Sequence, residues 1–151
     1  MKRFKTFASA AAMFAVLGAA GAASAQPLLT LPNRAVVAQQ GHGNGAAIAQ
    51  NGTANAAGIM QNGVNQGATI HQDGVANTGV IGQAGQNNNA AITQVGQNNS
   101  ACMVQQGRNL SSSMSQVGNN QRAGFITTRF GTRPLSPELC AAFARAFAAG
   151  R

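Results

Sequence analysis

The chain of 151 residues has no Trp and no Tyr, and Asp73 and Glu138 are its only acidic residues. Large aromatic side chains supply much of the buried area in an ordinary core, so their absence argues against a thick globular core. A catalytic pair of carboxylates would have to be built from these two isolated acids. The composition therefore points away from an enzyme.

The chain also has few residues that could form a metal site or a catalytic Ser site. His42 and His71 occupy different positions of the repeat described below, and no Ser has an acid and a base in register with it. Calcium-binding repeat proteins carry an acid in every unit, whereas this chain has one Asp in total. We therefore predict no catalytic site, no metal site and no cofactor.

The first 25 residues have the pattern of a cleavable export signal. Basic residues within the first five positions precede an apolar run at 7–20, and small residues at 23–25 provide a cleavage site. The run is shorter than the roughly 20 residues that span a bilayer. We expect a mature chain that begins at Gln26, passes through the periplasm and is located outside the cell.

Positive charge is concentrated near the C-terminus. Loss of the three basic signal residues lowers the net charge from +8 to +5. Scattered Arg without stacking aromatics argue against nucleic-acid binding, so an acidic polysaccharide, a lipid headgroup or a partner subunit is the expected counter-surface. Six of the seven remaining Arg lie beyond residue 107, namely Arg108, Arg122, Arg129, Arg133, Arg145 and Arg151.

An eleven-residue repeat organises the centre of the chain. Gln-x-Gly recurs without a slip at Gln39, Gln50, Gln61, Gln72, Gln83, Gln94, Gln105 and Gln116. An apolar residue stands two positions before each Gln, at Val37, Ile48, Ile59, Ile70, Ile81, Ile92, Met103 and Met114. A small residue stands four before. Five after, Asn is the commonest residue, at Asn44, Asn55, Asn77, Asn88 and Asn99. A ninth, degraded copy follows at 123–125.

The marked positions alternate with unmarked ones, which places them on one face of a strand. A right-handed coiled coil also has an eleven-residue period, but apolar sites two apart do not share a helix face and a helical Gly costs about 1 kcal/mol per repeat. We predict an all-β fold, a β-solenoid of eleven-residue repeats with two strands per coil and about four coils. Strands of six or seven residues joined by four-residue turns are expected.

Stacked repeats explain the polar residues of the predicted core. Each Gln or Asn amide is expected to donate to the identical side chain one coil away, which satisfies groups that otherwise cost about 1–3 kcal/mol when buried. These ladders end unpaired at the first and last coils, and 26–34 contains two Pro and no pattern of a folded cap. We therefore expect copies to add to one another, with a capped monomer as the alternative.

The repeats resemble those of curlin, the subunit of curli, the amyloid fibres of bacterial surfaces. The similarity rests on Asn44-x-Ala46-x-Ile48-x-Gln50-x-Gly52 and its later copies, and it covers about 35–127. It implies secretion by outer-membrane export machinery, polymerisation with itself and with a related curlin-type subunit, and roles in adhesion and biofilm matrix.

Two segments depart from the family. The segment 26–34 is short and apolar, and the chain from Pro134 onward is foreign to the repeat. The basic residues Arg122, Arg129 and Arg133 are similar to the deviant last repeat of the family's minor, nucleating subunit. Both the major and the nucleating role therefore remain open.

A helix is predicted near the C-terminus. Ser136, Pro137 and Glu138 provide an N-cap, a first-turn Pro and a first-turn acid. We expect this helix to be amphipathic and to pack across the last coil as a cap. Its apolar stripe is predicted at Leu139, Phe143, Ala146 and Phe147.

Cys102 and Cys140 are the only cysteines, and a disulfide is the default expectation in an exported chain. That bond would place the helix along the outside of the seventh repeat. Free thiols or a bond between two chains are the alternatives.

The sequence thus predicts a structural subunit of extracellular curli-type amyloid fibres, or fimbriae. A nucleating subunit and a capped, monomeric surface-binding solenoid are the alternatives, and surface polysaccharide or host matrix is a candidate partner. The expected segments are a signal peptide at 1–25, a linker at 26–34, the repeat solenoid at 35–127, an Arg- and Pro-containing linker at 128–136 and a helix at 137–149.

Overall fold

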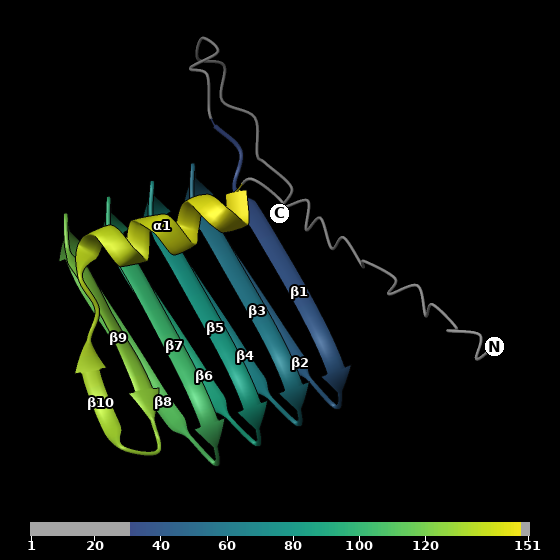
Figure 1. Ribbon diagram of the computed structural model, residues 1–151. Coiled ribbons are helices and arrows are strands. Elements are labelled where there is room, and N and C mark those ends of the chain that lie inside the picture. The colour runs from purple at the N-terminus through teal and green to yellow at the C-terminus, as the bar shows by residue number, and fades with distance from the viewer. Residues whose placement is uncertain (1–30, 149–151) are drawn as a thin grey trace, which may run out of the picture.

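The computed structural model describes residues 31–148, which form two facing layers of parallel strands with one helix on the outside (Figure 1). Sheet A has the strand order β1-β3-β5-β7-β9-β10, and sheet B has the order β2-β4-β6-β8. The predicted all-β solenoid of about four coils with a single short helix is confirmed. The elements are β1 (Arg34–His42), β2 (Gly45–Thr53), β3 (Ala56–Val64), β4 (Gly67–Val75), β5 (Thr78–Gln86), β6 (Asn89–Gln97), β7 (Ser100–Arg108), β8 (Ser111–Asn119), β9 (Arg122–Thr128), β10 (Gly131–Pro134) and α1 (Pro137–Ala148). The predicted export signal and most of the predicted N-terminal linker lie outside the described residues.

Each residue lies over its counterpart two repeats later. In sheet A, Ile59 pairs with Ile81 and Gln61 with Gln83. A coil therefore contains two strands, as predicted. Strands β1 to β8 have nine residues each, and only two residues lie between β1 and β2. The strands are longer than expected because parallel pairing continues through the corner residues.

The apolar core is narrow and consists of a column of large apolar side chains beside small residues such as Ala57 and Ala68. Its column is fully buried in the middle coils, while Val37 is 45 % exposed at the first coil and Met114 is half-buried at the last. At about 1.5–3 kcal/mol per buried side chain, this column supplies the main apolar stabilisation. The buried members are Ile59, Ile70, Ile81, Ile92 and Met103.

Each corner combines a Gly of positive φ with a left-handed residue two positions later. After β2 these are Gly52 (φ 99°) and Ala54 (φ 59°). Asn tolerates the left-handed region better than most residues do, and it fills most of these positions. The corner Gly residues stack so closely that a Cβ on Gly85 would collide with the carbonyl oxygen of Gly107 in the next coil.

We predict that Gly85→Ala destabilises the solenoid by on the order of 2 kcal/mol or more, because strained backbone and a steric collision act together. Urea unfolding of the monomer measures the change. Gly82→Ala is the matched control, since Gly82 lies in the same strand, has no positive φ, and an added Cβ there would make only an ordinary contact with Val104 at 4.0 Å. Equal stabilities for the two variants would contradict this account of the corner.

The segment 128–136 is more than the expected linker. The chain turns after β9 and returns as β10, which pairs antiparallel with β9 so that Gly131 faces Thr128 and Pro134 faces Phe125. A hydrogen bond from the Phe130 N–H to the Thr128 hydroxyl, 3.2 Å long, stabilises the turn. Gly131 adopts a φ of 119°, which the turn requires. This hairpin follows from local turn chemistry, which the eleven-residue pattern does not encode.

Helix α1 begins at Pro137, as predicted, and the Leu139 N–H donates to the Ser136 hydroxyl at 3.4 Å. A bond from its own backbone N–H and one from Ser136 lower the pKa of the Glu138 carboxyl. Among the described residues, none of the helices is long and apolar enough to cross a membrane.

The expectation that α1 caps the last coil is wrong. The helix lies along the outer face of sheet A, against β5, β7 and β9 (Figure 1). The predicted apolar stripe is also wrong at Leu139, which is 51 % exposed, because the helix buries Cys140 instead. The side chains of Phe143, Ala146 and Phe147 lie outside the described part of the helix.

Candidate assembly interface

Two columns of Gln side chains run through the solenoid. In sheet B, Gln72 Nε2 donates to Gln94 Oε1 at 2.7 Å, and Gln94 repeats the bond to Gln116. In sheet A, Gln39, Gln61 and Gln83 each donate in the same way to the next member, ending at Gln105. Gln50 starts the sheet B column. Each amide thus bonds to its counterpart one coil away.

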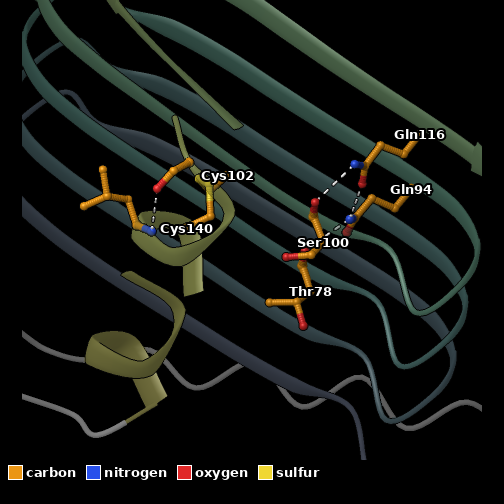
Figure 2. Close-up of a disulfide and its surroundings, with 8 residues drawn as sticks. Thr78, Gln94, Ser100, Cys102, Gln116 and Cys140 are labelled. Atoms are coloured by element: carbon orange, nitrogen blue, oxygen red, sulfur yellow. Dashed lines mark hydrogen bonds between the residues drawn. A yellow bond between two sulfur atoms is a disulfide. The ribbon is translucent and has the colours of Figure 1, made fainter. Parts of the chain in front are cut away.

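A second bond fixes which way the Gln amides from Gln50 to Gln116 point. Gln94 Nε2 also donates to the carbonyl oxygen of Thr78, and Gln116 Nε2 to that of Ser100, both at 3.1 Å (Figure 2). A carbonyl only accepts hydrogen bonds, so the nitrogen must lie on that side of the amide. The ladder therefore has a direction, with N–H groups facing later coils and oxygens facing earlier ones.

The Asn residues do not form the side-chain ladder that was expected. Asn55 Nδ2 donates to the carbonyls of Asn51 and Gly74, and Asn55 Oδ1 accepts the backbone N–H of Asn77. The shorter Asn side chain reaches the corner backbone rather than its counterpart. Each Asn thereby closes its own corner and links it to the corner one coil on. Asn44, Asn77, Asn88 and Asn99 bond to the corner backbone in the same way.

The Asn column begins one repeat earlier than predicted. Asn33 Oδ1 accepts the backbone N–H of Asn55 at 3.0 Å, and Asn33 Nδ2 donates to the Gly52 carbonyl. Counting eleven residues back from Asn44 locates this residue, but no Gln-x-Gly precedes it. The repeat pattern therefore extends into the segment expected to be a linker.

Gln66 interrupts the Asn column in the buried coils. Its Nε2 donates to the carbonyls of Asn62 and Gly85 as an Asn would, but its Oε1 is buried without a partner. Because Gln has one more methylene than Asn, its side-chain oxygen does not accept the backbone N–H of the next coil as the Asn oxygens do. A buried polar atom left unpaired costs about 1–3 kcal/mol.

We predict that Gln66→Asn stabilises the solenoid by about 1 kcal/mol, because the shorter side chain restores the bond to the backbone N–H of Asn88. Thermal or urea unfolding measures this gain. Gln121→Asn, at the equivalent but exposed position of the last corner, is the control and should change little. A destabilised Gln66→Asn variant would contradict the assignment of the unpaired oxygen.

We predict that Gln94→Ala costs on the order of 3 kcal/mol or more. The change leaves Gln116 Oε1, the Thr78 carbonyl and one N–H of Gln72 without partners in the core. Gln97→Ala, on the exposed side of the same strand, should stay within about 0.5 kcal/mol of the wild type. Similar urea midpoints for both variants would show that the ladder adds little stability.

At the N-terminal end, both sheets finish in edge strands, β1 and β2. We call the free edges of these two strands the N-terminal edge. All of β1 is exposed. Within the described part of the chain, no group donates a hydrogen bond to Oε1 of Gln39 or Gln50. The N-terminal edge thus presents hydrogen-bond acceptors.

At the C-terminal end, the two sheets finish differently. In sheet B, β8 is the last strand, and one N–H of Gln116 has no acceptor among the described residues. In sheet A, Thr127 stands in the Gln position of β9, and its hydroxyl lies 3.0 Å from that of Thr132 in β10 and 3.1 Å from that of Ser112. We call the outer edges of β8 and β9 the C-terminal edge.

The structure brings Cys102 and Cys140 together in a disulfide with a Cα–Cα distance of 5.5 Å (Figure 2). Cys102 points outward from β7, so the bond fastens α1 to the outer face of sheet A. Val80 and Leu135 pack around it. Gly124 makes room, since a Cβ there would overlap both sulfur atoms.

The other polar residues considered above do not converge. His42 and His71 are exposed in different strands, and Asp73 accepts a hydrogen bond from Asn51 at 3.2 Å. Within residues 31–148, no three His, Cys, Asp or Glu side chains are grouped so that they could hold a metal ion. The described chemistry is that of amide ladders and open strand edges.

The register, the corners and the ladders define a repeat protein of the parallel β-solenoid class. The family model for the curlin associated repeat matches the chain twice, at residues 65–96 and 96–124. The matched segment therefore consists of curlin associated repeats, which confirms the resemblance of these repeats, and they support a subunit of a curli-type fibre. Both the family and the fold are structural rather than enzymatic. No curated protein matches the chain.

Proposed function

We propose that the chain is an extracellular structural subunit of a curli-type amyloid fibre and that it joins its neighbours by continuing both sheets and the Gln ladder that ends at Gln116. The observation that carries the proposal is the complementarity of the two ends. The N-terminal edge offers the amide oxygens of Gln39 and Gln50, and the C-terminal edge offers the remaining N–H of Gln116. A head-to-tail junction pairs donor with acceptor, whereas two N-terminal edges would oppose acceptors.

The register supports the same junction. If β1 of one copy pairs with β8 of another, Val37 covers Met114 and Gln39 continues the ladder from Gln116. Val37, 45 % exposed in the single chain, then gains the burial that its counterparts have in the middle coils. Few charges in the repeats and an unbroken strand pattern favour such stacking.

The proposal includes export through the periplasm and an outer-membrane pore, since the first 25 residues have the pattern of a signal. It also includes a place in adhesion and biofilm matrix. A groove of about 810 Å³ between α1 and the starts of β5, β7 and β9 is lined by Arg122 and Arg145. Its charge suits an acidic surface polysaccharide or host matrix.

One observation favours the nucleating subunit as a second candidate. Arg122, Arg129 and Arg133 are all exposed at the β9–β10 end, and the Arg129 guanidinium lies 4.4 Å from the ring centroid of Phe130. A basic end with an exposed aromatic ring fits attachment to a surface while the N-terminal edge recruits a related subunit.

We predict that mature chains, residues 26–151, form seeded fibres that bind thioflavin T and diffract near 4.7 Å. Val37→Lys should slow seeded elongation by at least about tenfold, because it places a charge inside the junction. Val36→Lys, on the outward side of the same strand, is the matched control and should elongate at nearly the wild-type rate.

Both residues are exposed in the single chain, at 45 % and 39 %, so neither change should alter monomer folding. Equal elongation of the two variants would rule out the junction through β1. A soluble, β-rich monomer that ignores seeds would instead support a capped surface-binding solenoid.

A further inference from the structure

A neighbour can continue the stack in only one arrangement. Strands β1 to β9 alternate between the sheets, and because their number is odd, the next copy must begin on sheet B. Its β1 then pairs with β8 and its β2 with β9, so successive copies are related by a half-turn about the fibre axis. Inward residues match at both contacts, since β9 carries Ala123 and Phe125 where β2 carries Ala46 and Ile48.

The place of the incoming β2 is already taken. Strand β10 pairs with Phe125–Thr128 of β9, which is where Ile48 and Gln50 of the next copy would lie. The hydroxyl of Thr132 in β10 also shares a hydrogen bond with the hydroxyl of Thr127. The open β8 and the covered β9 make the C-terminal edge half accessible.

We propose that β10 is an internal substitute for β2 of a second copy, so that each addition to a fibre requires β10 to leave β9. This inference rests on the proposed function and specifies how its junction is controlled. The occupant is a second copy of this chain, because the inward positions of β9 continue the repeat register that β2 carries and no charged side chain points inward from either strand.

The disulfide keeps β10 in place. Leu135, directly after β10, donates its N–H to the Gly124 carbonyl at 2.8 Å and packs beside Cys102 and Cys140. With β9 fixed at one end and the Cys102–Cys140 bond at the other, the intervening segment is a short closed loop. While the disulfide is intact, this loop gives β10 less freedom to move away from β9 than a free C-terminal segment would have.

A dithiol reductant removes this restraint by thiol–disulfide exchange. A thiolate of the reductant attacks one sulfur, the Cys102–Cys140 bond breaks, and the reductant closes to a cyclic disulfide. The two cysteines gain two electrons and two protons and become thiols. Helix α1 and β10 are then tethered to β9 through the main chain alone.

The test is seeded elongation of the mature full chain, followed with thioflavin T, in oxidised and dithiol-reduced samples. We expect reduction to raise the rate about tenfold, and Cys102→Ser with Cys140→Ser to match the reduced wild type. Gly131→Ala keeps the disulfide but strains the β9–β10 turn, where φ is 119° and the added Cβ meets no atom within 4 Å. It should raise the rate about fivefold in oxidised samples.

Gly82→Ala is the control and should leave the rate unchanged. Hydrogen exchange of the fibres adds a direct readout, in which β9 stays protected while the β10 amides exchange. Equal rates for oxidised wild type, reduced wild type and Gly131→Ala would overturn the role of β10 but leave the fibre function standing. Absence of elongation in every sample would overturn the proposed function and this inference together.

Discussion

The structure depends on a buried Gln amide that makes three hydrogen bonds at once. Gln94 accepts from Gln72 and donates both to Gln116 and to the Thr78 carbonyl. Polar groups in a narrow core are costly when unpaired, so their burial is favoured when donors and acceptors are used. All three partners are in place only while the repeat stays in register. A slip of one residue would turn the apolar column and both ladders out of the core.

The same interaction makes the two ends of the solenoid chemically different. Because backbone carbonyls fix the Gln amides from Gln50 to Gln116 in one orientation, acceptors remain at the N-terminal edge and a donor of Gln116 remains at the C-terminal edge. A symmetric core would offer no preference between head-to-head and head-to-tail contacts. Here the polarity of the molecule comes from side-chain amides as well as from the parallel strands.

The repeating features of the fold could be predicted from the sequence, whereas the β9–β10 hairpin, which occurs once, could not. Spacing alone identified the strands, the inward face, the apolar column and the Gln ladders, because every copy reports the same environment. Spacing could not predict that the Asn and Gln amides bond to different partners. One methylene decides whether the amide reaches its counterpart in the next coil or the corner backbone. The β9–β10 hairpin depends on local turn geometry that the spacing does not encode. For α1, the apolar stripe suggested a cap on the last coil, whereas the cysteines suggested a place along the outside of the seventh repeat, and the helix lies where the Cys102–Cys140 bond holds it.

The ninth repeat differs from the others in a coordinated way rather than by simple decay. Thr127 replaces the Gln, and its hydroxyl lies within hydrogen-bonding distance of those of Thr132 and Ser112. Gly124 leaves the outward space that the disulfide occupies, and Gly131 permits the turn that returns β10 to β9. These three residues all act on β9 or on the turn that follows it, which random loss of the pattern would not explain. The last repeat is therefore better understood as a closure of sheet A, built from the same positions that keep the earlier repeats open to stacking.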